Sequence, residues 1–202
     1  MMAARPLALA AAGALLAAFA APTHAHLVET GFGAFYDGLA HVVLTPADLL
    51  VVLAVALLAG QRGAQSARWS LLALPLAWLG GGLLGSAHPA AVVLPALTTL
   101  TFGVAGALVA LNARLAAGPV AILAFAAGLL HGYGNGATMA PGGASGLALA
   151  GAVAAVFSGF AIVAAEVTTL QAGWARIAVR AAGSWLAAAS ILMLGWLVRP
   201  VA

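Results

Sequence analysis

Residues 44–60 read LTPADLLVVLAVALLAG, and this stretch decides the fold. Thr45 is a typical residue immediately before a helix, Pro46 suits the first helical position, and the acid Asp48 suits the first turn. The sequence therefore predicts that a helix begins at Thr45. An unbroken apolar run follows Asp48, and the whole segment 39–60 is long enough to cross a bilayer, which takes about 20 apolar residues.

Two titratable residues flank this helix start. His41 is expected in a short helical or interfacial segment, 36–44, that folds against the bundle. Asp48 has two interpretations that do not exclude each other, because a carboxylate has two oxygens. It caps the new helix, or it binds a cation together with other polar groups. Ionisable side chains are costly in a membrane, so either role needs a partner for the charge.

The composition places the chain among membrane proteins. Of its 202 residues, 65% are hydrophobic and 5% are charged, whereas an ordinary soluble domain has about 25% charged residues. We expect an all-α, polytopic membrane helix bundle with the lipid bilayer as its main partner. Cysteine is absent, which excludes disulfides and thiolate metal sites. No basic patch with interleaved aromatic residues indicates nucleic-acid binding, and no permanently bound cofactor is expected.

The chain begins with a segment typical of a signal peptide, expected over residues 1–25. Arg5 precedes a short apolar stretch, and small residues follow at Ala20 and Ala25, so that cleavage after either one fits the pattern. The remainder, 26–202, is expected to be a single transmembrane domain of about six helices. These are predicted over 39–60, 69–85, 90–111, 119–133, 147–170 and 177–198.

The distribution of arginine predicts the orientation, since every basic residue of the chain other than histidine is an arginine. Loops on the cytoplasmic side of a membrane are enriched in Lys and Arg. If the mature N-terminus lies outside, five arginines are cytoplasmic and one, Arg199, is external. We therefore expect a multi-pass protein of the bacterial inner membrane. The five are Arg62, Arg68, Arg114, Arg176 and Arg180.

Most of the remaining polar residues fall on the outer side of this topology. His131 and Asn135 are four residues apart, so that one helical turn would stack them. Imidazole and carboxylate donors suit nickel, cobalt, zinc or Cu(II). The candidate metal ligands are His26, His41, Asp48, His131 and Asn135. A site built from them requires the first and fourth spans to touch.

Two other polar residues are less informative. His88 precedes Pro89 in a short predicted loop, which is typical of a solvated turn histidine. Glu166 lies towards the cytoplasmic end of the fifth span. It is interpreted either as a relay for a proton or metal ion, or as the partner of an arginine near the interface, and pairing is the preferred interpretation.

Several of these features resemble the HupE/UreJ family of membrane proteins. They are the leader, the Gly31–Phe35 segment, the block from His41 to Asp48-Leu-Leu, and the sequence HGYGNG from His131. The resemblance covers most of the chain in architecture and two short motifs in detail. It implies a small polytopic protein that acts as a secondary permease for nickel or cobalt.

The motifs depart from the family pattern. The family's first motif is His-Pro-x-x-Gly-x-Asp-His, and here Val42 replaces the proline, while Ala47 and Asp48 stand at the acid and the second histidine. The second motif is His-Gly-x-Ala-His-Gly-x-Glu, and here Asn135 and Thr138 replace the later histidine and the glutamate. The ligand set is therefore reduced, and the metal is left open.

The expected function is secondary transport of a divalent transition-metal ion, of the nickel or cobalt class, across the inner membrane. The site would use histidine and aspartate near the outer face. The alternative is a non-transporting membrane accessory protein that binds or delivers metal for metalloenzyme maturation, with maturation proteins as partners. An enzyme is not expected, because no serine or acid pair stands with a histidine in a pattern that suggests nucleophilic chemistry.

Overall fold

The computed structural model describes residues 29–88, 95–140 and 146–199, and within these ranges every regular element is a helix. Four helices, α4, α6, α7 and α8, are long and apolar enough to cross a membrane. The helices are α2 (Ala34–Leu44), α3 (Pro46–Gln61), α4 (Ala64–Ala87), α5 (Pro95–Ala110), α6 (Ala117–Met139), α7 (Gly146–Thr169) and α8 (Gly173–Leu197). The expected all-α membrane bundle is thus found.

The first span is broken where the sequence predicts a helix start. Helices α2 and α3 meet at Thr45 with a bend of 74°, and together they pass as one apolar span. Pro46 occupies the start of α3, where its missing N–H costs no helical hydrogen bond. The backbone N–H of Thr45 donates to the carbonyl of His41 at 2.9 Å. The break therefore places His41 and Asp48 on either side of one corner.

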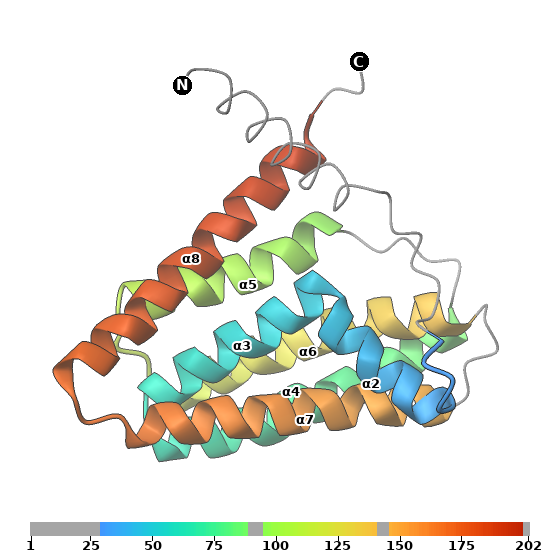
Figure 1. Cartoon of the computed structure of the whole chain (residues 1–202), viewed down its shortest axis with the longest axis horizontal. Helices are drawn as coiled ribbons and strands as arrows, with labels where there is room; N and C mark the ends of the chain where they lie inside the picture. Colours follow the sequence, from blue (N-terminus) through green and yellow to red (C-terminus); the bar gives the residue numbers. More distant parts are fainter. Residues whose placement is uncertain (1–28, 89–94, 141–145, 200–202) are drawn as a thin grey trace, which may run out of the picture.

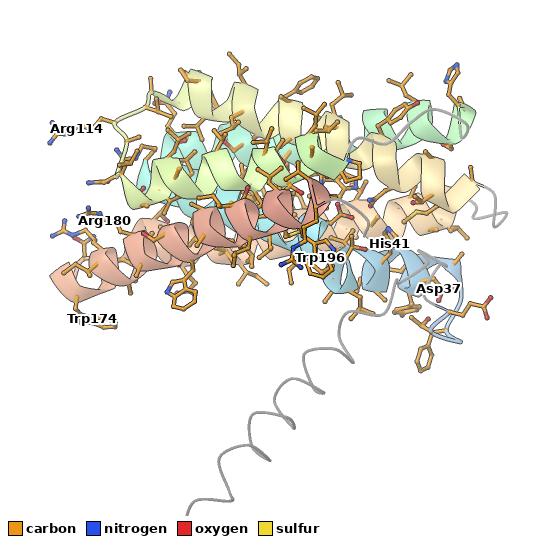
Figure 2. The ribbon with its side chains drawn as sticks, turned by 90° about the horizontal axis from the view of Figure 1, so that it is seen from above. Asp37, His41, Arg114, Trp174, Arg180 and Trp196 are labelled. Carbon is orange, nitrogen blue, oxygen red and sulfur yellow. The ribbon has the colours of Figure 1, made fainter. Side chains whose placement is uncertain are left out.

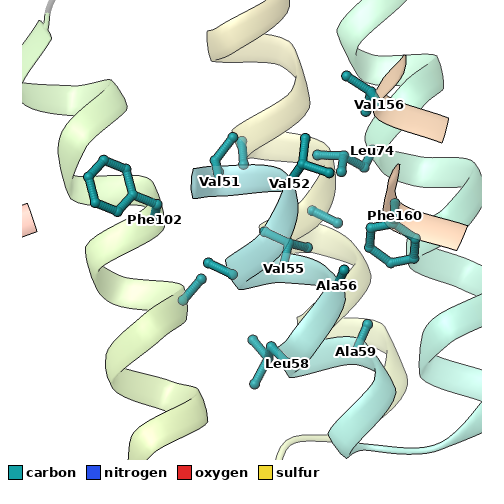
Figure 3. Packing of buried hydrophobic residues seen from close by; sticks show 14 of the residues in the cluster. Val51, Val52, Val55, Ala56, Leu58, Ala59, Leu74, Phe102, Val156 and Phe160 are labelled. Atoms are coloured by element: carbon teal, nitrogen blue, oxygen red, sulfur yellow. The ribbon is translucent and has the colours of Figure 1, made fainter. Parts of the chain in front are cut away.

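Helix α3 is the centre of the bundle (Figure 3). Its side chains Val51, Val55 and Leu58 are fully buried. Phe102 of α5 and Phe160 of α7 pack around it and are also fully buried. A helix that is apolar on all sides is covered by other helices or by lipid, and α3, which has no polar residue between Asp48 and Gln61, is packed mainly against α5 and α7.

Helices α4 and α6 run in parallel at very close range. A Cβ added at Gly128, Gly132 or Gly136 of α6 would meet the backbone of Leu74, Trp78 or Gly82 of α4, respectively. Glycines at this spacing let two backbones approach closely, which is how membrane helices gain packing energy without a hydrophobic driving force. This contact fixes the position of α6 along its axis relative to α4.

Helices α5 and α8 form a second pair that leans away from the rest (Figure 1). Gly106 of α5 packs against Gly183 and Leu186 of α8, and Ser190 donates a hydrogen bond to the carbonyl of Thr99. Although α7 and α8 are consecutive, they make almost no contact with each other. A wedge is left between them, with α3 behind it.

The two ends of the bundle differ in charge. Figure 2 shows Arg114 and Arg180 at one end, and Asp37 and His41 towards the other. We name the first the arginine end, which holds Arg62, Arg68, Arg114, Arg176 and Arg180, and the second the histidine end, which holds His41, His88 and His131. The predicted separation of arginines from histidines is therefore present in three dimensions.

Some predicted boundaries need correction. The fourth span was expected to end at 133, but α6 continues without interruption to Met139, because its glycines are used for packing on α4 and not for unwinding. The second span is also longer than expected, since α4 covers 24 residues. About six spans were expected. In the described residues four helices are long enough to cross a membrane, or five spans with the bent α2–α3 pair, and α5, described from Pro95, is a shorter apolar helix of 16 residues. The expected signal peptide and His26 lie outside the described residues.

Candidate metal site in the bundle core

The centre of the site is a buried pair between two helices. Asp48 Oδ1 and His131 Nδ1 are 2.7 Å apart, and the two residues are only 4% and 1% exposed. Asp48 is the third residue of α3, and His131 lies on α6, eight residues before its end, or about 12 Å along the helix. The first and fourth spans therefore touch, which is what a site built from Asp48 and His131 requires.

The second carboxylate oxygen of Asp48 is bound by Asn135. Its Nδ2 donates to Asp48 Oδ2 at 2.7 Å, so that one turn of α6 supplies both partners of the carboxylate. Trp78 of α4 donates from Nε1 to Asn135 Oδ1 at 3.2 Å, and its ring stacks on His131 with centroids 5.5 Å apart. The close α4–α6 packing thus locks the orientation of the amide and the imidazole.

Thr101 of α5 contacts the other nitrogen of the imidazole. Its Oγ1 lies 2.9 Å from His131 Nε2 and 2.7 Å from the carbonyl oxygen of Thr98. A hydroxyl has one hydrogen to donate. If it donates to Thr98, it accepts from Nε2–H. If it donates to Nε2, that nitrogen carries no proton. The orientation of one hydroxyl is therefore linked to the position of the proton in this contact.

His41 stands beside this network without joining it. It is 6% exposed and lies in the last turn of α2, within the electrostatic reach of Asp48. In the described ranges, however, no three His, Cys, Asp or Glu side chains are arranged to share a metal ion. The expected ligands Asp48, His131 and Asn135 are brought together, and His41 is adjacent to them. His26 lies outside the described residues.

Asp48 is not used as a helix cap. Thr45 makes no side-chain capping hydrogen bond, and both oxygens of Asp48 are taken by α6. The sequence TPAD therefore predicts the start of the helix correctly, but the carboxylate of Asp48 contacts another helix and does not cap its own. The contact between Asp48 and His131 is the one salt bridge found in residues 29–88, 95–140 and 146–199.

The two remaining candidates lie away from the site. His88 is exposed at the end of α4, and its Nδ1 contacts the carbonyl of Leu84 at 3.1 Å, which agrees with a turn histidine. Glu166 is exposed on α7. The pairing of Glu166 with an arginine is not found, since the described part of the chain contains no such ion pair.

Sequence reasoning missed two residues of the site. They are Trp78 and Thr101, neither of which was assigned a role from the sequence. A tryptophan in mid-span was the available signal for Trp78, because a buried indole N–H needs an acceptor. For Thr101, the partner on another helix could not be inferred from spacing within its own helix.

Comparison with known proteins gives one clear result. A family model described as HupE / UreJ protein matches residues 11–198, which is most of the chain. Searches of curated proteins and of solved structures each found no match. Because the matched region contains every helix described above and all residues of the buried network, the chain belongs to the HupE/UreJ family.

Proposed function

We propose that the chain is a secondary permease for a divalent transition-metal ion of the nickel or cobalt class. The HupE/UreJ family is associated with nickel and cobalt transport and with urease and hydrogenase maturation. The observation that carries the proposal is the buried His131–Asp48 pair at the meeting point of four helices. Intramembrane ionisable residues of this kind mark ion and proton pathways.

The geometry suggests a division of labour between the two residues. Metal-bound histidines usually donate their second ring N–H to a carboxylate, which fixes the tautomer and orients the ring. Asp48 holds Nδ1 in this manner, so the metal would bind at Nε2 of His131 after Thr101 rotates away. His41 is a second buried imidazole within the electrostatic reach of Asp48, but it is not grouped with the pair. Asp48 is then mainly an orienting group.

Metal and proton compete for the same atom in this scheme. Nε2 of His131 has one lone pair in the neutral ring, and protonation removes it. Entry of a metal ion therefore requires an unprotonated Nε2, and arrival of a proton favours release. The sequence contains no lysine and no P-loop motif, so ATP would not drive the step through this chain. The proton gradient or the membrane potential would supply the driving force.

The proposed orientation follows from the arginines. The arginine end faces the cytoplasm of a bacterial cell, and the histidine end faces the outside. The site is then reached from the outer face of the inner membrane. This arrangement keeps the metal-binding groups on the side from which a scarce ion would be collected.

A second candidate is an accessory protein that binds metal for metalloenzyme maturation and does not transport it. One observation favours it. Both oxygens of Asp48 and both nitrogens of His131 already have partners, so the network is stable without a metal ion and has no third acidic or imidazole ligand in the described residues. Binding without flux would be the outcome expected for this role.

Uptake of nickel or cobalt into proteoliposomes distinguishes the two candidates. For wild type we expect saturable flux, because each molecule offers a single site at His131 Nε2. For His131→Ala we expect at least about a 100-fold loss, since even partners of a metal ligand contribute 10- to 100-fold to metal affinity.

His88→Ala is the matched control, because His88 is an exposed histidine at the same end. It should transport like wild type. Equal flux in wild type and His131→Ala would contradict the proposed site. Metal binding with no flux in wild type would reject the permease in favour of the accessory role.

A further inference from the structure

A cavity at the arginine end is lined by unpaired positive charge. It has a volume of about 370 Å³ and lies between the ends of α3 and α7, the turn after α5, and the start of α8. Arg62, Arg176 and Arg180 all line it, and none of them forms an ion pair with a carboxylate in the described residues. Such a cavity is electrostatically suited to an anion.

The polar atoms inside this cavity are incompletely satisfied. Arg62 donates from Nη2 to Asn112 Oδ1, but its Nε is buried without a partner, as is Gln61 Oε1. Burial and the nearby charge of Arg114 lower the pKa of the Arg62 guanidinium, and an anion at this point would offset the repulsion between the two arginines. Buried polar groups are normally hydrogen-bonded, and of these two the Nε of Arg62 is a donor, the kind of group that an anion binds.

An apolar groove continues directly from the cavity. It has a volume of about 410 Å³ and lies in the wedge between α7 and α8, with α3 behind it. The lining residues of groove and cavity follow one another by one turn on each helix: Leu57 and Gly60 on α3, Val163 and Val167 on α7. The cavity and the groove therefore lie end to end, and we call the two together the crevice, which is charged at the arginine end and apolar above it.

The length of the crevice, cavity and groove together, matches one leaflet of a bilayer. On α3 it extends from Gln61 back to Leu50, which at 1.5 Å per residue is about 16 Å. Half of a hydrocarbon core is about 15 Å. An acyl chain anchored by a headgroup at the arginines would thus lie along Leu57, Leu53 and Leu50 as far as the middle of the membrane.

We propose that this crevice binds one anionic phospholipid, with its phosphate among Arg62, Arg176 and Arg180 and an acyl chain in the groove between α7 and α8. Guanidinium groups bind phosphate oxygens in bidentate fashion, and basic pockets between membrane helices recognise anionic headgroups. The lipid fills the space between two consecutive helices that hardly touch. This inference is independent of metal transport.

The test is lipid titration of the purified full-length protein, read by native mass spectrometry with phosphatidylglycerol and phosphatidylcholine as probes. Wild type should prefer phosphatidylglycerol. The double variant Arg176→Gln/Arg180→Gln should lose about tenfold or more of that preference, since a hydrogen bond to a charged group corresponds to about that factor. Both side chains are exposed, so the variant should fold.

Two further variants separate the contributions. Arg68→Gln is the matched control, because Arg68 lies at the same end but does not line the cavity, and its lipid preference should equal that of wild type. Ala182→Phe fills the groove and should weaken binding of the lipid while leaving the cavity open to inorganic phosphate.

Three results would overturn the proposal. Wild type without preference for phosphatidylglycerol would exclude the site. An equal loss in Arg68→Gln would show that general surface charge, and not the cavity, attracts the lipid. The third result has two parts: inorganic phosphate raises the melting temperature of wild type as much as phosphatidylglycerol does, and Ala182→Phe binds both probes as strongly as wild type. This result would identify a site for free phosphate and exclude the lipid.

Discussion

Replacing Asp48 by alanine is expected to destabilise the protein by about 3 kcal/mol or more and to abolish metal transport. The carboxylate is 4% exposed and is the shared partner of His131 and Asn135. Removing one member of a buried pair leaves the other without compensation, which costs about 3–5 kcal/mol. The free energy of unfolding in detergent and flux in proteoliposomes measure the two effects.

Asp37→Ala is the control for this prediction. Asp37 is also an acid near the histidine end, but it accepts hydrogen bonds from Thr30 within its own segment and touches no residue of the network. Its loss should leave transport unchanged. If Asp48→Ala unfolded at the wild-type temperature and carried metal normally, the carboxylate would have neither the structural nor the functional role assigned to it.

Gly132→Val is expected to disable the site without altering any polar group in it. A Cβ at position 132 would overlap the carbonyl of Trp78 on α4, so α6 must move away or rotate. His131 is the preceding residue, and its contacts with Asp48 and Thr101 would be lost with that movement. Overpacking of this kind costs about 1–3 kcal/mol. Thermal stability and metal flux should both fall.

Gly80→Ala is the matched control for the helix contact. Gly80 lies on α4, but nothing lies within 4 Å of a Cβ built there. Replacing an open helical glycine by alanine is expected to stabilise the helix by about 0.5–1 kcal/mol. Normal flux in Gly132→Val would mean that the α4–α6 contact does not position His131.

Local sequence signals predicted the elements well. Thr45 and Pro46 located the break between α2 and α3 because the chemistry of a helix start is written in adjacent residues. The spacing of His131 and Asn135 predicted that both would share one helical face, and both indeed contact Asp48. The arginines predicted a common end of the bundle, and Arg114 and Arg180 lie together there (Figure 2), although Arg68, Arg176 and Arg180 belong to helices and not to loops.

Contacts between helices were harder to predict from the sequence. The stacking of Trp78 on His131 depends on the parallel alignment of α4 and α6, which the glycine spacing permits but does not specify. Likewise, the role of Thr101 depends on the position of α5 along its axis relative to α6. The glycines near His131 were compatible with an unwound backbone or tight packing, and the neighbouring helix decided between them. Pairwise register is a property of the assembled bundle and not of one segment.

X-ray absorption spectroscopy of the nickel- or cobalt-loaded protein tests the proposed site most directly. The spectrum of wild type should contain imidazole scattering from a nitrogen at about 2 Å from the metal. Part of this scattering should disappear in His131→Ala and remain in His88→Ala. An unchanged imidazole signal in metal-loaded His131→Ala would contradict binding at His131 and with it the proposed path of the ion.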